Sequence, residues 1–244
     1  MPWVKICGTT NPEDARLAVD AGADALGFVF AESPRRVTAE RARQIIAELP
    51  AEVEKVGVFV NEPVQRILEV ADQAGLTAIQ LHGDEPPETP RAIKRASSGE
   101  RPLRVIRAGP LIPWLDDSHE ADAIGWDPAL LGIVERGPGG EPVRTGNIDA
   151  LLVDSGTPQK RGGTGAPFDW IRGSILITMM SSFVKVIVAG GLTPENVAEA
   201  LQRLRPWGVD VVSGVEREAG KKDPEKVRAF IEAVRQADKE SSRL

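Results

Sequence analysis

Short apolar runs alternate along this chain with longer segments in which hydrophobic positions recur at helical spacing. Segments 42–49, 64–71 and 197–204 each place apolar residues at i, i+3, i+4 and i+7, the pattern of an amphipathic helix. The apolar runs are only four to six residues long, which is typical of buried strands. Eight runs are predicted as strands: Val4–Cys7, Ala25–Phe30, Val56–Val60, Ala78–His82, Leu103–Arg107, Leu151–Asp154, Val184–Ala189 and Val209–Ser213.

Several helices also carry a start signal. Asn11, Thr193 and Asp223 are each followed directly by a proline, which predicts an N-cap and a proline in the first helical turn. A strand, a crossover helix and a parallel strand, repeated eight times, indicate an α/β protein with a closed (β/α)8 TIM barrel. We expect a single domain over residues 1–244. An open, doubly wound sheet is the alternative fold.

One region interrupts the alternation. Between the fifth and sixth predicted strands, Gly109 to Asn147 contains two prolines beside Leu111, an acidic pair and a Gly-Pro-Gly-Gly sequence. A short helix is predicted between Pro128 and Glu135. So long a connection is uncommon in a compact domain and indicates an insertion. Of a lid and a tolerated surface insertion, the second is favoured.

Composition narrows the class of partner. The length of 244 residues is close to the roughly 250 of a typical eight-fold barrel. There are 36 acidic and 30 basic residues, the net charge is −6, and the basic residues are dispersed. This pattern argues against nucleic acid and anionic membranes as partners and favours a small polar substrate. Without a signal-peptide pattern or an apolar run of about 18 residues, we expect a cytoplasmic location.

Cysteine and histidine are scarce. The single cysteine excludes an internal disulfide, and the two histidines, His82 and His119, lack the spacing of a metal motif. No metal site is therefore predicted.

Two reactive side chains stand where predicted strands end. Cys7 closes the first strand and Asp154 the sixth, so in a barrel both emerge at the carboxyl rim, where barrel enzymes hold their catalytic groups. A thiol and a carboxyl facing one pocket are a candidate base and acid. The alternatives are a small buried core residue for Cys7 and a turn carboxylate for Asp154, since Ser155 and Gly156 follow it.

Glycine-bearing turns indicate phosphate. Gly190 and Gly191 follow the seventh strand, and Ser213 and Gly214 follow the eighth, so the two turns are predicted to lie side by side. Backbone N–H groups at such turns approach an anion closely, and barrels commonly bind phosphate there. The cluster Gly162–Gly165, after Lys160 and Arg161, suggests either a mobile loop over the site or an ordinary connection.

Taken together, these motifs resemble the phosphoribosylanthranilate isomerase family. The resemblance covers nearly the whole chain, with the motifs in the family's order, and departs from it in the segment after Arg107 and at Ala166-Pro167. It is carried by Val4–Asn11, Gly27–Phe30, Gly57–Asn61, Gln80–Gly83, Leu152–Ser155, Gly162–Gly165, Phe168–Trp170, Ala189–Leu192, Pro194–Val197, Ser213–Glu216 and Gly220–Asp223.

The resemblance implies a TIM barrel that performs a cofactor-independent Amadori rearrangement in tryptophan biosynthesis. Asp154 matches the family's acid, which protonates the ring oxygen of the aminoaldose, and Cys7 matches its base, which removes the C2′ proton. An unperturbed thiol, with a pKa near about 8.5, is mostly protonated at neutral pH. The cationic imine of the opened substrate is our hypothesis for what favours the thiolate.

The same resemblance supplies substrate contacts. Arg36 matches the arginine near the anthranilate carboxylate, which a guanidinium holds with two parallel hydrogen bonds, and Arg35 is interpreted as its solvated neighbour. Gln80, His82 and Asp210 match positions that line the family's pocket. A lone strand histidine is more often a hydrogen-bonded core group, which weakens the interpretation of His82.

Two other functions stay open. Lys5 lies two residues before Cys7 and should face the same way, so it could form a Schiff base in an aldolase-like lyase. Its position below the rim argues against this. The second alternative is a phosphate-binding barrel without catalysis.

Overall fold

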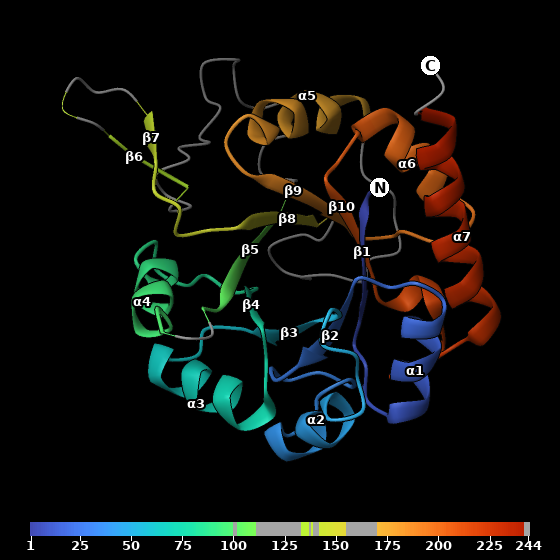
Figure 1. The fold of residues 1–244 in the computed structure, drawn as a ribbon. Helices are drawn as coiled ribbons and strands as arrows, with labels where there is room; N and C mark the ends of the chain where they lie inside the picture. The colour runs from blue at the N-terminus through green and yellow to red at the C-terminus, as the bar shows by residue number, and fades with distance from the viewer. Residues whose placement is uncertain (100–101, 111–132, 137, 139–141, 155–169, 242–244) are drawn as a thin grey trace.

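Eight parallel strands close into a barrel surrounded by helices (Figure 1). The computed structural model describes residues 1–99, 102–110, 133–136, 138, 142–154 and 170–241. The barrel strands, in spatial order, are β1 (Trp3–Cys7), β10 (Gly208–Val211), β9 (Lys185–Ala189), β8 (Ala150–Asp154), β5 (Arg104–Pro110), β4 (Ala78–Leu81), β3 (Glu54–Phe59) and β2 (Ala25–Val29). The helices are α1 (Pro12–Asp20), α2 (Ala39–Ile46), α3 (Val64–Ala74), α4 (Thr89–Ala96), α5 (Trp170–Ser181), α6 (Val197–Leu204) and α7 (Pro224–Ser241).

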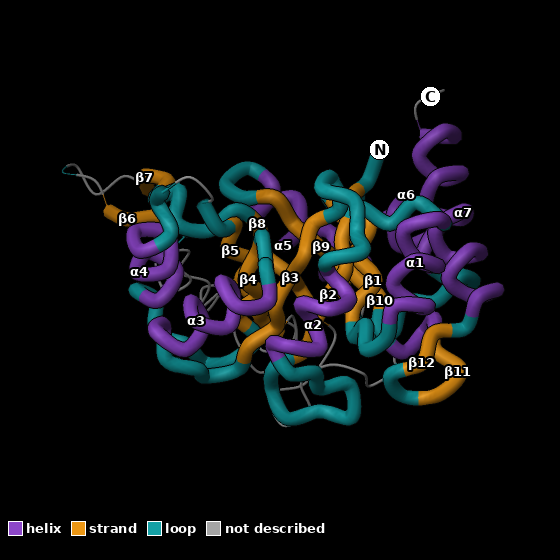
Figure 2. The backbone as a smooth tube through the Cα atoms, turned by 60° about the horizontal axis from the view of Figure 1, so that its bottom comes forward, coloured by secondary structure: helices purple, strands orange, loops and turns teal. Residues whose placement is uncertain are grey.

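The predicted barrel is confirmed, with small shifts at the strand ends. All eight predicted strands are barrel strands, and the doubly wound alternative is wrong because β1 pairs with both β2 and β10. β5 continues to Pro110 rather than Arg107, and β10 ends at Val211 because Ser213–Val215 forms a 3₁₀ turn. Figure 2 shows helices α1 to α4 lying outside the strands.

The core has two layers. Small and branched side chains such as Ala25, Val56 and Ile106 fill the barrel interior, and a larger apolar layer separates the strands from the helices. Trp3 and Trp207 stack with their ring centroids 5.2 Å apart and pack against the interior cluster. Both indoles lie where β1 and β10 begin, so they close the end of the barrel opposite the carboxyl rim.

Two of the three predicted helix starts are confirmed. Asn11 caps α1, and the Asp223 carboxylate accepts hydrogen bonds from the first backbone N–H groups of α7. The start predicted at Thr193 is wrong, because α6 begins at Val197. The Asn196 amide instead closes a turn, accepting from the Thr193 N–H at 2.8 Å and donating to the Gly191 carbonyl at 2.9 Å.

The predicted insertion contains a hairpin beside the barrel (Figure 1). In the sequence, this hairpin comes between β5 and β8, and its strands β6 (Val134–Arg136) and β7 (Pro142–Arg144) pair antiparallel as a separate sheet. The Arg144 side chain donates a hydrogen bond to the Ser182 carbonyl. The helix predicted between Pro128 and Glu135 is wrong at its end, because Ile133 forms a bend and the two residues after it belong to β6; the rest of it, 128–132, lies outside the described residues. Among the described helices, none has the length and hydropathy to cross a membrane.

The Asn11 cap gives a test of the fold. Its side-chain oxygen accepts from the Asp14 N–H at 2.8 Å, and Asp14 in turn accepts from the Lys222 N–H at 2.9 Å. Asn11→Ala should lower the free energy of unfolding by about 1 kcal/mol, measured by urea denaturation. Glu232→Ala, at an exposed helix position, should change it by less than about 0.5 kcal/mol. Equal stability of the two variants would contradict the capping role.

Candidate active site

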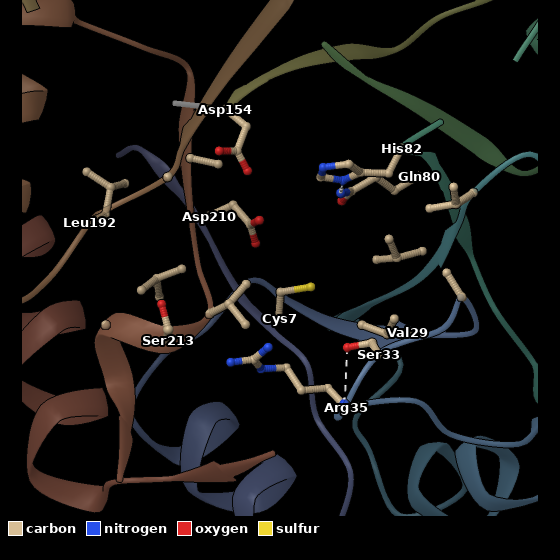
Figure 3. A pocket seen from close by; sticks show the side chains of 18 of the residues that line it. Cys7, Val29, Ser33, Arg35, Gln80, His82, Asp154, Leu192, Asp210 and Ser213 are labelled. Carbon is tan, nitrogen blue, oxygen red and sulfur yellow. Dashed lines mark hydrogen bonds between the residues drawn. The ribbon is translucent and has the colours of Figure 1, made fainter. Parts of the chain in front are cut away.

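A cavity of about 370 Å³ opens among the carboxyl ends of the barrel strands (Figure 3). Residues at or just beyond the ends of β1, β2, β3, β4, β8, β9 and β10 line it, so the closed sheet brings distant parts of the sequence together. Its walls include nine of the ten residues predicted for the site, which are Cys7, Gln80, His82, Asp154, Gly190, Gly191, Asp210, Ser213 and Gly214.

The predicted acid and base share this cavity. Cys7 ends β1 and is 4% exposed, and Asp154 ends β8 and is 9% exposed. Figure 3 shows the Cys7 sulfur and the Asp154 carboxylate facing one space, with Gln80 and His82 on the other side. Burial raises the pKa of the Cys7 thiol, and the positive charges of Lys5 and Lys222 oppose that rise. At rest, therefore, the thiol is favoured over the thiolate.

Space for the Cys7 side chain comes from a glycine on the neighbouring strand. Gly27 pairs with Cys7 across β2 and β1, and a Cβ atom at Gly27 would lie 2.5 Å from the Cys7 sulfur. In the sequence, Gly27 drew attention only as the first residue of the motif Gly27–Phe30. Its signal was a glycine inside a strand, which often marks a close approach.

A buried ion pair lies behind the cavity wall. Lys5 is fully buried, and its Nζ lies 2.8 Å from Asp210 Oδ1 on the paired strand β10. Burial alone would lower the pKa of Lys5, but the negative charge of Asp210 and its hydrogen bond with Lys5 outweigh burial and raise that pKa. A Schiff-base lysine needs a neutral amine, so this environment disfavours the lyase alternative.

Polar groups on β4 offer contacts to a ligand. Gln80 Nε2 and His82 Nδ1 lie 2.8 Å apart, and both side chains line the cavity. Gln80 is 1% exposed, and its Oε1 finds no hydrogen-bond partner within the described part of the chain. A buried amide oxygen of this kind is costly unless a ligand group donates to it.

The two glycine turns meet, as predicted. Gly190 and Gly191 have φ values of +83° and +63°, a left-handed conformation that favours glycine. A Cβ atom at Gly214 would lie 1.9 Å from the Leu192 carbonyl oxygen, so the turn after β10 touches the turn after β9. The two loops thereby meet at the wall of the cavity. The Gly162–Gly165 loop predicted over the site lies outside the described residues.

Of two adjacent arginines, the structure brings Arg35 and not Arg36 to the cavity. The backbone of Arg36 forms an isolated β-bridge with that of Val29, and Arg36 lines a separate cavity together with Glu62. Arg35 is 22% exposed rather than solvated, and its Nε and Nη2 lie 2.9 and 2.6 Å from the Glu216 carboxylate oxygens. Arg35 lies in a turn that Ser33 stabilises by accepting a hydrogen bond from the Arg35 N–H, so the turn directs the two adjacent side chains differently.

A second buried lysine, missed by sequence reasoning, supports this arrangement. Lys222 Nζ donates to the Cys7 carbonyl at 2.6 Å and to Glu216 Oε1 at 3.1 Å. It lies on β12 (Lys221–Lys222), which pairs with β11 (Glu216–Glu218). Burial alone would raise the pKa of Glu216, but hydrogen bonding to Arg35 and the charge of Lys222 hold it below its ordinary value. Glu216 thus stays charged and fixes both cations.

Metal ligands are not gathered in the described chain. No group of three histidine, cysteine or acidic side chains there is placed to hold a metal ion. The absence of a metal or cofactor stays a prediction.

Comparison with known proteins decides the family. The model of the family described as "N-(5'phosphoribosyl)anthranilate (PRA) isomerase" matches residues 4–106 and 141–233. The chain belongs to this family. The match omits 107–140, which falls almost entirely within the predicted insertion.

Relatives within the isomerase family match the chain over nearly its whole length. N-(5'-phosphoribosyl)anthranilate isomerase from Pelobacter propionicus is 42% identical over 241 residues, 98% of this chain and 99% of the relative. The Rubrobacter xylanophilus isomerase is 43% identical over 237 residues, covering 96% of this chain and 100% of the relative.

Solved structures agree. The Thermotoga maritima phosphoribosyl anthranilate isomerase superposes with a TM-score of 0.76 at 39% identity, over 97% of this chain and 100% of the other. A further isomerase structure, a complex with reduced 1-(o-carboxyphenylamino)-1-deoxyribulose 5-phosphate, gives a TM-score of 0.73 at 38% identity over the same shares.

The contact between the two turns gives a test of the site's architecture. Gly214→Ala would force its methyl group against the Leu192 carbonyl, so the free energy of unfolding should fall by about 1–3 kcal/mol. Gly99→Ala is the matched control, because a Cβ atom there meets nothing within 4 Å. Urea denaturation of both variants measures the difference. Wild-type stability in Gly214→Ala would mean that the turns are not in contact.

Proposed function

We propose that this protein converts N-(5'-phosphoribosyl)anthranilate into 1-(2-carboxyphenylamino)-1-deoxyribulose 5-phosphate, a cofactor-independent step of tryptophan biosynthesis. Family membership supports the reaction, as does a related isomerase that binds a reduced form of this aminoketose. The observation that carries the proposal is one cavity lined by a strand-end thiol, a strand-end carboxyl and two glycine turns. The predicted cytoplasmic location stays a prediction.

Asp154 is the proposed acid. Its carboxyl protonates the ring oxygen of the aminoaldose, the C1′–O bond breaks, and the nitrogen lone pair forms a C1′ iminium ion. The Asp154 side chain is only 9% exposed and lines the cavity, so it meets a bound sugar in a largely water-free place.

Cys7 is the proposed base. Its thiolate removes the C2′ proton, the C–H electrons form the C1′–C2′ double bond, and the iminium nitrogen becomes neutral. The resulting enol-amine becomes the aminoketose when C1′ takes up a proton and the C2′ hydroxyl loses one. Cys7 and Asp154 come from strands on different sides of the cavity, so a sugar between them meets a base and an acid at once.

The phosphate and the anthranilate carboxylate bind at different walls in this proposal. Backbone N–H groups at Gly190, Gly191, Ser213 and Gly214 hold the phosphate. Arg35 replaces Arg36 as the carboxylate ligand, because its guanidinium lines the cavity and Glu216 fixes its orientation.

Contacts to the middle of the substrate complete the proposal. Asp210 accepts from a sugar hydroxyl, and the unpaired Gln80 oxygen accepts from a hydroxyl or from the anthranilate N–H. His82, hydrogen-bonded to Gln80, fixes the orientation of that amide.

Acid–base catalysis is tested by the loss of anthranilate fluorescence with freshly generated substrate. Cys7→Ala and Asp154→Asn should each lower kcat by about 100-fold or more, because each removes a proton-transfer group. Glu232→Ala, on the outer surface, is the control and should keep wild-type activity. A folded wild type that binds the product without turnover would instead favour the phosphate-binding barrel.

Carboxylate recognition is tested on the two adjacent arginines. Arg35→Met should raise KM by roughly 10–100-fold, the loss expected for a charge-assisted hydrogen-bonding pair. Arg36→Met, which removes the same charge one residue away, should leave KM within about twofold, because a solvent-exposed charge outside the cavity contributes little to substrate binding. The reverse ranking would restore Arg36 as the ligand.

A further inference from the structure

The Lys5 ammonium lies between two groups of the cavity wall. Its Nζ is 2.8 Å from Asp210 Oδ1, and its positive charge opposes the rise that burial causes in the pKa of the Cys7 thiol. Cys7 follows two residues later on β1, so strand alternation turns both side chains to the barrel interior. Lys5 is completely buried, whereas both of its partners line the cavity.

This position is an unusual one for a cation. The neighbouring strands fill the same interior with apolar side chains such as Ala25, Val56 and Ala78. A buried ion pair is weak support for stability, because apolar residues of similar volume often stabilise a core as well. A fixed positive charge next to the only thiol of the chain therefore calls for a role beyond packing.

We propose that Lys5 is a positioning residue that makes Cys7 an effective base, its ammonium stabilising the thiolate while Asp210 holds that ammonium in place. The inference rests on the proposed function for the role of Cys7 as base. It differs from the hypothesis that the substrate's own cation favours the thiolate. That cation exists only after ring opening, whereas Lys5 faces Cys7 before any substrate arrives.

The other charges around the pair do not replace Lys5. Around Cys7, Asp210 raises the pKa of the thiol and Lys222 lowers it, although Lys222 is hydrogen-bonded to the Cys7 carbonyl and to Glu216. A negative charge on Cys7 would also raise the pKa of Arg35, but the Arg35 guanidinium is already bound by the Glu216 carboxylate.

Other titratable groups nearby come from β3, from β8 and from the residue just after β4. Asp154 and His82 line the same cavity, and Glu54 of β3 interacts with Lys5 by charge. Among the groups that lower the pKa of Cys7, Lys5 has the largest effect.

Because Cys7 is the single cysteine, its alkylation by iodoacetamide as a function of pH reports this thiolate alone. Lys5→Met should raise the midpoint of the alkylation profile by about one pH unit or more, the shift expected when an adjacent opposite charge is lost. Lys55→Met is the matched control. It removes another buried strand lysine, whose ammonium binds the Pro50 and Ala51 carbonyls, and should leave the midpoint unchanged.

Lys5→Gln separates charge from packing. It keeps a donor for Asp210 but has no charge, so the midpoint should rise as in Lys5→Met even if Lys5→Met fails to fold. A wild-type midpoint in folded Lys5→Gln would overturn the inference.

Kinetics give an independent readout. In Lys5→Gln, kcat at neutral pH should fall at least about tenfold with KM within about threefold, and higher pH should restore part of it as the thiol ionises. An inactive wild type whose Cys7 midpoint still depends on Lys5 would contradict the proposed function and leave the Lys5–Cys7 coupling standing. An active wild type with an unmoved midpoint in Lys5→Gln would contradict the Lys5 inference alone.

Discussion

The geometry of the cavity depends on the hydrogen bonds that the buried Lys222 side chain makes at the carboxyl end of the barrel. The ammonium binds the carbonyl at the end of β1, the Val212 carbonyl after β10 and the Glu216 carboxylate. The first and last strands of the barrel are therefore joined at their carboxyl ends by more than their own ladder. Through Glu216, the same cation also fixes Arg35 on the loop after β2.

The amino end of the barrel contributes mainly to stability, and the carboxyl end holds the candidate active site. At the amino end, Trp207 stacks on Trp3 and lies under the cations of Arg104 and Lys185, at 5.6 and 4.4 Å from its ring centroid. At the carboxyl end, buried polar groups such as the Gln80 amide oxygen are retained at a cost in stability. A dry, well-packed base lets the opposite rim carry those groups.

Local patterns were enough to predict most of the fold and much of the site. The eight strands follow from short apolar runs, and Cys7, Asp154 and the glycine turns follow from their places at strand ends. The family resemblance assigns the anthranilate carboxylate to Arg36, whereas Arg35 is the arginine that lines the cavity, because sequence does not show which of two adjacent side chains an irregular loop turns inward.

Other features could not be predicted from the sequence, because they depend on hydrogen bonds that local patterns do not reveal. Lys222 meets the Cys7 carbonyl across a separation of 215 residues, and no local pattern carries such information. The start of α6 was misplaced because Asn196 bonds back to the preceding turn, where Thr193-Pro194 looked like a cap.

The close approach of Gly27 to the Cys7 sulfur has a consequence for how this family can change. A methyl group at position 27 would occupy the volume of the thiol, because the two residues are paired across adjacent strands. Positions 7 and 27 therefore cannot vary independently. A side chain at 27 would displace the thiol, so position 27 has to stay glycine for as long as Cys7 keeps the role proposed for it.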